Sequence, residues 1–198
     1  METQGMLLTL ARAFGLGLSQ YRVLASRQPD AANMGAQRES QLATLDLNRQ
    51  IALPDGQIYT IGRRGGPFSL DRELWRGATP VLGEPPVAVF RRERKGLRRR
   101  DVLIVDATPG RRLLVRRRAW LGSPANADVV AFSSDAEPSA NDRVLLHAEK
   151  SGTWRKRIQA QWLAPSELPL PITVFILNVL ADLDRRAAAA ASAGVAGV

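Results

Sequence analysis

The fold is decided by one stretch near the C-terminus, which reads Leu168-Pro169-Leu170-Pro171-Ile172-Thr173-Val174-Phe175-Ile176-Leu177-Asn178-Val179-Leu180-Ala181-Asp182-Leu183. Pro171 suits the first turn of a helix, because the amide hydrogen that proline lacks has no helical partner there. Arg185 and Arg186 follow, where positive side chains complement the negative end of a helix dipole. The helix is apolar on every side for about three turns, so other elements must surround it.

The same stretch is too short to cross a bilayer as a helix. A membrane-spanning helix needs about 20 apolar residues. Here the apolar run covers only the 14 residues 168–181, contains Asn178 and is followed by Asp182. We therefore expect a helix that is buried in the core of a folded domain.

The chain before this helix, from Leu42 to Leu163, consists of short apolar runs separated by turn residues. The clearest hairpin joins residues 101–106 to residues 111–116 through Pro109-Gly110, because proline fixes φ and glycine accepts a positive φ. In the last run, polar residues alternate with a second set that should face inward: Trp154, Lys156, Ile158, Ala160 and Trp162. About eight to ten such strands at near-regular spacing indicate a barrel or a sandwich.

The two ends of the chain differ from this β region. Apolar residues between Met6 and Leu18 recur at helical spacing and predict a short amphipathic helix. The polar segment from Ser26 to Ser40 predicts a linker. Residues 187–198 are rich in Ala and Gly and predict a disordered tail. We therefore expect a helix and linker over 1–41, a β domain over 42–186 and a tail over 187–198.

Composition excludes several kinds of catalytic and metal site. The chain has no cysteine and a single histidine, which removes disulfides, zinc–thiolate sites, iron–sulfur clusters and two-histidine metal sites. That histidine, His147, lies in a strand pattern and is interpreted as structural. The carboxylate pairs Asp182/Asp184 and Asp135/Glu137 leave a carboxylate-only calcium site as the one open alternative. We predict a protein that is not an enzyme, with no cofactor and no metal site.

Positive charge is concentrated in one part of the chain. The net charge is +9, from 28 Lys and Arg against 19 Asp and Glu, and the residues between 91 and 118 account for all of it. The candidate anion- or lipid-binding residues are Arg91, Arg92, Arg94, Lys95, Arg98, Arg99, Arg100, Arg111, Arg112, Arg116, Arg117 and Arg118. Such a field attracts phosphate-rich partners, either nucleic acid or an anionic membrane surface. The alternative is that these charges bind no partner and form an ordinary solvated surface. In that case they reflect only the composition of the chain, which has 25 Arg and only 3 Lys.

Two of the four tryptophans lie next to these charges or to others like them. Trp120 comes shortly after the run Arg116 to Arg118, and Trp154 directly precedes the run Arg155 to Arg157, whereas Trp75 and Trp162 adjoin no run of basic residues. Aromatic rings among basic residues stack on bases or anchor at a membrane interface. The alternative is that they fill the core of the β domain.

A series of antiparallel strands that ends in one hydrophobic helix resembles the tubby C-terminal-like superfamily, which includes the phospholipid scramblases and the LURP-one-related proteins. The resemblance rests on the hairpin 101–118, the strand 154–162, and the helix 172–183 with the two arginines after it. It implies a mainly β fold: a closed antiparallel β-barrel, usually of twelve strands, around a buried hydrophobic C-terminal helix. It also implies a role at lipid. The chain lacks the cysteine-rich and proline-rich segments of animal scramblases and does not match the phosphoinositide-binding residues of tubby proteins, so no functional residue is carried over.

Three hypotheses about function remain open. The first is a non-enzymatic tubby-like barrel, cytoplasmic and peripheral to a membrane, that binds anionic phospholipid through its basic hairpin. The second is a nucleic-acid-binding barrel that uses the same charges with Trp120 and Trp154. The third is a structural or protein-interaction barrel with no phosphate ligand.

Overall fold

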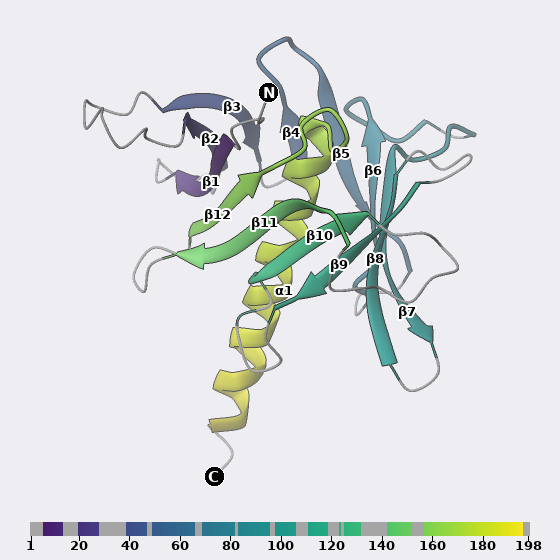
Figure 1. Cartoon of the computed structure of the whole chain (residues 1–198). Coiled ribbons are helices and arrows are strands. Elements are labelled where there is room, and N and C mark those ends of the chain that lie inside the picture. The colour runs from purple at the N-terminus through teal and green to yellow at the C-terminus, as the bar shows by residue number, and fades with distance from the viewer. Residues whose placement is uncertain are drawn as a thin grey trace.

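The computed structural model describes residues 6–13, 20–27, 39–46, 49–65, 69–81, 83–95, 98–105, 111–118, 123, 125–131, 142–151 and 157–195. These residues form twelve strands and one helix (Figure 1). The elements are β1 (Met6–Ala13), β2 (Gln20–Arg27), β3 (Ser40–Leu45), β4 (Gln50–Ala52), β5 (Ile58–Arg63), β6 (Arg72–Arg76), β7 (Ala88–Lys95), β8 (Arg98–Val105), β9 (Arg111–Arg117), β10 (Ala127–Ala131), β11 (Val144–Ser151), β12 (Arg157–Trp162) and α1 (Leu170–Val195).

The strands form a closed antiparallel barrel. Each strand pairs with the next in the chain, and β1 pairs with β12 to close the ring. The hairpin expected around Pro109-Gly110 is present as β8 and β9, whose register places Asp101 opposite Val115 and Val105 opposite Arg111. The expected fold class, a mainly β closed barrel with a buried C-terminal helix, is confirmed.

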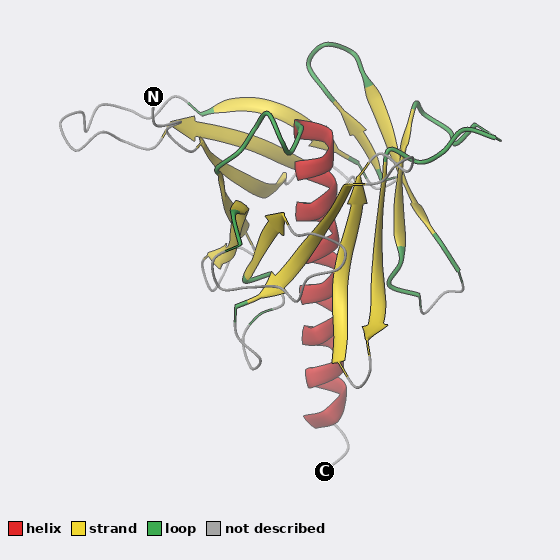
Figure 2. Cartoon of the chain, turned by 45° about the vertical axis from the view of Figure 1, so that its right-hand side comes forward, coloured by secondary structure: helices red, strands yellow, loops and turns green. Residues whose placement is uncertain are grey.

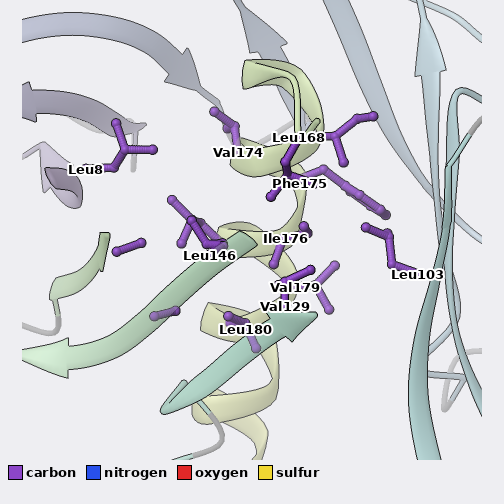
Figure 3. Packing of buried hydrophobic residues seen from close by; sticks show 14 of the residues in the cluster. Leu8, Leu103, Val129, Leu146, Leu168, Val174, Phe175, Ile176, Val179 and Leu180 are labelled. Atoms are coloured by element: carbon purple, nitrogen blue, oxygen red, sulfur yellow. The ribbon is translucent and has the colours of Figure 1, made fainter. Parts of the chain in front are cut away.

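Helix α1 runs through this barrel and supplies the centre of its core (Figure 2). All six residues from Ile172 to Leu177 are buried, with exposed fractions of 3% or less, so the helix is enclosed on every side as its sequence predicts. Figure 3 shows the side chains of α1 between Leu8 of β1 on one side and Leu103 of β8 on the other. Within the described residues, no helix combines the length and the apolarity that a membrane crossing requires.

The start of α1 is fixed by polar contacts with the preceding chain. Pro171 occupies the first turn, as expected. The Trp162 indole donates a hydrogen bond to the Leu168 carbonyl at 2.9 Å, and the Thr173 hydroxyl donates to the carbonyls of Leu168 and Pro169 at 3.2 Å. These contacts use buried polar groups that would otherwise lack partners.

The prediction for the N-terminal region is wrong. Met6–Ala13 and Gln20–Arg27 are strands, not a helix and a linker, so the barrel begins at Met6 and has twelve strands instead of eight to ten. A short apolar run fits both a helical and an alternating pattern. Here the alternating pattern prevails, because Leu8 and Leu10 face the core and β1 covers the edge that β12 would otherwise leave unpaired. Residues 28–38 of the expected linker lie outside the described residues.

The prediction of a disordered tail is also wrong as far as Val195, since α1 continues to that residue. Alanine is the strongest helix former, and extending an existing helix adds a hydrogen bond for each residue fixed. Arg185 and Arg186 therefore lie inside the helix and not in its last turn. They pair instead with Asp182, at 3.3 Å each.

Because consecutive strands run in opposite directions, the connections between them alternate between the two ends of the barrel. The connections β1–β2, β3–β4, β5–β6, β7–β8, β9–β10 and β11–β12 lie at one end, from which α1 emerges toward its C-terminus (Figures 1 and 2). We call this the exit end. The connections β4–β5 and β6–β7 lie at the opposite end, together with the start of α1.

Candidate anion-binding surface

The twelve candidate basic residues lie on three adjacent strands, β7, β8 and β9, or immediately after β9. Asp101 of β8 is the centre of the first group. Its carboxylate, 7% exposed, accepts hydrogen bonds from Arg92 at 2.6 and 3.0 Å and from Arg117 at 3.1 Å. Arg92 and Arg117 therefore neutralise the buried carboxylate of Asp101.

A second group lies on the outer face of the same strands. Glu93 pairs with Arg91 at 2.8 Å and with Arg112 at 2.5 Å, which joins β7 to β9. Arg111 lies at the end of the barrel opposite the exit end, where it pairs with Glu167 at 2.5 Å. These three guanidinium groups are also held by carboxylates of the protein itself.

The third group extends the outer face to β10 and β11. Arg116 and Arg118 each approach Asp128 at 3.6 Å, and Arg118 also donates to the Ala148 carbonyl at 2.6 Å. His147 Nδ1 lies 2.7 Å from the Asp128 carboxylate, so this histidine is part of the same network. Arg100 is engaged in an interaction as well. Every candidate whose side chain is described thus has a partner within the protein.

The remaining four candidates lie at the end of the β7–β8 ladder. In the register of these strands Arg94 is opposite Arg99 and Lys95 is opposite Arg98, next to the pair of Glu93 and Arg100. Like charges directly opposite each other destabilise a sheet. The side chains of these four residues lie outside the described part, but their backbone places four positive charges at the tip of one hairpin at the exit end.

Another basic group, which the charge pattern of the sequence does not predict, lies at the exit end. Arg72 of β6 is buried, with a side chain only 4% exposed, and its guanidinium donates to the Asp182 carboxylate of α1 at 2.7 Å. Arg185 and Arg186 pair with the same carboxylate. The burial of Arg72 could have been predicted from the alternation in β6, because alternation places Arg72 on the same face as the buried Leu74.

The pKa values at this site reflect burial and close charges. Burial raises the pKa of Asp182, but the hydrogen bond from Arg72 and the charges of Arg186, Arg72 and Arg185 outweigh it, so the pKa is lower than usual. Burial lowers the pKa of Arg72 and exceeds the opposing effect of Asp182. The guanidinium stays charged at neutral pH, because arginine does not deprotonate in proteins.

An open groove lies beside His147 on the outer face. Its volume is about 310 Å³, and its lining includes His147, Glu149, Gln159 and Gln161. These residues provide an imidazole, a carboxylate and amides, but the described lining holds no hydroxyl, thiol or amine to act as a nucleophile.

The other candidate residues have structural surroundings or fall outside the described residues. Trp162 is buried and Trp75 is half-buried, whereas Trp120, Trp154, Asp135 and Glu137 lie outside. Asp184 contacts Ser123 at 2.6 Å and Lys150 at 3.0 Å. Within the part of the chain that the structure describes, no three His, Asp or Glu residues group together to hold a metal ion.

Comparison of the chain with protein-family models, curated proteins and solved structures gave no match. No activity, ligand or partner therefore comes to this chain from a relative.

Proposed function

We propose that this protein is a non-enzymatic, tubby-like barrel, cytoplasmic and peripheral, that binds an anionic membrane surface through its exit end. The observation that carries the proposal is the backbone register of the β7–β8 hairpin, in which Arg94 is opposite Arg99 and Lys95 is opposite Arg98. An anionic surface offsets the repulsion within these pairs. Arg91, Arg92 and Arg117, further along the same strands, are paired with carboxylates of the protein.

The position and surroundings of the hairpin also favour a surface over a compact ligand. Gly96 and Leu97 join the two strands, so an apolar residue lies in the sequence between the four charges. Each basic residue near an anionic leaflet contributes about 1 kcal/mol, so four contribute about 4 kcal/mol. That corresponds to about a thousandfold in affinity.

Nucleic-acid binding is the second hypothesis, and it lacks one of its requirements among the described residues. Stacking on bases needs aromatic side chains that are open to solvent. The described tryptophans, tyrosines and phenylalanines are all buried or half-buried. Trp120 and Trp154, which this hypothesis uses, lie outside the described residues, so we base the choice of a membrane surface on the register of the hairpin charges and retain DNA as an outcome of the test.

The test is co-sedimentation with vesicles of phosphatidylcholine, with and without phosphatidylserine. The triple variant Arg94→Gln/Arg98→Gln/Arg99→Gln removes three of the four hairpin charges. A matched control, Arg76→Gln/Arg111→Gln/Arg143→Gln, removes the same charge from the end of the barrel opposite the exit end. We expect the wild type and the control to bind phosphatidylserine vesicles, and the hairpin variant to bind about a hundredfold more weakly.

Added salt should weaken the binding, because exposed charges are screened beyond about 10 Å at 0.1 M salt. Equal binding by the hairpin variant and the control would contradict the proposal. Binding of the wild type to duplex DNA but not to phosphatidylserine vesicles would replace it with the nucleic-acid hypothesis.

A further inference from the structure

A cavity of about 230 Å³ opens at the exit end between the β3–β4 turn, β6 and α1. Its lining includes Tyr21, Arg49, Arg72, Asn178, Asp182 and Arg185. Pockets for drug-sized ligands have volumes of about 300–1,000 Å³, so this cavity suits a smaller group. Except for Leu45, the described lining residues have polar or charged side chains, which favours a polar or charged occupant.

The charge around this cavity is not balanced. Arg49, Arg72 and Arg185 line it, and Arg63 and Arg186 are close enough to act electrostatically on the first two. Only two carboxylates line the cavity, Asp46 and Asp182. The described lining therefore carries three guanidinium groups against two carboxylates, which leaves one positive charge in excess, and Arg63 and Arg186 add to the positive potential around it.

Arg49 is one of the residues on which these charges act. Among the described residues, its guanidinium has no hydrogen-bond or ion-pair partner, although the side chain is partly buried. Burial lowers the pKa of Arg49, and repulsion from Arg63, Arg72 and Arg185 lowers it further, against the attraction of Asp182. A partly buried cation without a partner is unfavourable unless an anion joins it.

The backbone of Arg49 also departs from what an arginine prefers. Its φ is 64°, in the left-handed region that glycine and asparagine adopt most readily. The conformation is fixed on both sides, because the Arg49 amide donates to the Asp46 carbonyl at 3.1 Å and its carbonyl accepts from the Ile61 amide at 2.8 Å. Backbone hydrogen bonds alone therefore hold Arg49 in this conformation, and its side chain takes no part in the turn. Residues with a strained backbone of this kind cluster at ligand sites.

We infer that this cavity is a binding site for a phosphate group, in which the Arg49 guanidinium donates hydrogen bonds to the phosphate oxygens and Arg72 and Arg185 supply further positive charge. Guanidinium groups match phosphate geometry with two parallel hydrogen bonds. The site is separate from the β7–β8 hairpin and does not depend on membrane binding. The phosphate belongs either to a free ion or to a lipid head group that is exposed at the exit end.

The test compares the thermal unfolding of the wild type and of Arg49→Gly in a buffer free of phosphate, with inorganic phosphate or chloride added at equal ionic strength. Phosphate should raise the wild-type midpoint by several degrees, because a ligand that binds only the folded state stabilises it. For Arg49→Gly, we expect at least a tenfold higher phosphate concentration to be needed for the same shift. Without phosphate, the midpoint of this variant should be equal to or above that of the wild type, because glycine accepts the positive φ.

Two further variants act as controls. Arg76→Gln, which removes one charge at the opposite end of the barrel, should keep the full phosphate response. The triple hairpin variant Arg94→Gln/Arg98→Gln/Arg99→Gln should also keep it, so failure of the vesicle test does not affect this one. The inference is overturned if phosphate does not stabilise the wild type, if Arg49→Gly responds as the wild type does, or if its phosphate-free midpoint falls by several degrees.

Vesicles distinguish the two sources of the phosphate. Phosphatidic acid presents a terminal phosphate, whereas phosphatidylserine does not. If the phosphate belongs to a lipid, the wild type should prefer phosphatidic acid and Arg49→Gly should lose that preference. If it is a free ion, both proteins should bind the two lipids equally while the phosphate shift of the wild type remains.

Discussion

Phe175→Ala should lower the free energy of unfolding by about 3–5 kcal/mol, which corresponds to a fall of roughly 6–20 °C in Tm for a domain of this size. Phe175 lies in the middle of α1 and is fully buried, so its removal leaves a cavity that strands on every side would have to fill. Closed barrels collapse poorly around such a cavity, because every strand is held by two neighbours. Thermal or urea unfolding of the purified protein measures the loss.

Val81→Ala is the matched control for this prediction. Val81 is 51% exposed and lies in the connection between β6 and β7, so its truncation should change the free energy of unfolding by less than about 0.5 kcal/mol. A Phe175→Ala protein with an unchanged Tm would show that α1 is not enclosed by the barrel.

Asp182→Ala should destabilise the protein by about 3–5 kcal/mol at pH 7, because it leaves Arg72 as a buried charge without a carboxylate. Arg72 would keep its hydrogen bonds to the carbonyls of Ser69 and Asp71, at 2.9 and 2.8 Å, but not its ion pair. Arg185 and Arg186 would lose the same partner. Glu84→Ala is the control, since Glu84 is exposed and its carboxylate has no partner within the described residues.

The pH dependence of this effect has a defined direction. The pKa of Asp182 is lower in the folded protein than in the unfolded chain, because the attraction of Arg72, Arg186 and Arg185 outweighs its burial. The contribution of the carboxylate to stability is therefore complete above the unfolded pKa of about 3.9 and is lost as the pH falls through the folded value. The difference between wild type and Asp182→Ala should be constant from pH 7 to pH 5 and shrink below about pH 4. A constant difference down to pH 2.5, measured by urea unfolding, would contradict the assigned ion pair.

The parts of the fold that the sequence predicts correctly depend on local patterns. The apolar surface of α1 on every side requires enclosure, and the Pro109-Gly110 turn with its flanking β-branched runs predicts the β8–β9 hairpin. Strand β1 was not predicted, because its leucines also match helical spacing. Only its pairing with β12, more than a hundred residues away, decides between the two patterns.

In the candidate site, too, local sequence patterns predict some features, whereas contacts between distant residues decide the others. Local sequence identifies the cluster of basic residues but not their partners, because these partners are distant in the sequence. Arg118 contacts Glu149 of β11, and Arg111 contacts Glu167, which lies between β12 and α1. The ion pair of Arg72 with Asp182 joins residues 110 positions apart. The backbone of Arg49, whose guanidinium has no partner among the described residues, is fixed by the turn in which it lies. Charge density can be predicted from the sequence, whereas neutralisation of each charge depends on tertiary contacts.

The most direct test of the proposed membrane contact is to locate the part of the barrel that enters the lipid interface. The chain has no cysteine, so a single cysteine at position 97, between β7 and β8, or at position 81, at the opposite end, can carry a polarity-sensitive dye. With vesicles that contain phosphatidylserine, the emission of a dye at position 97 should shift to the blue, and that of a dye at position 81 should not change. A shift at position 81 alone, at neither position, or equally with phosphatidylcholine vesicles would contradict binding of an anionic membrane by the exit end.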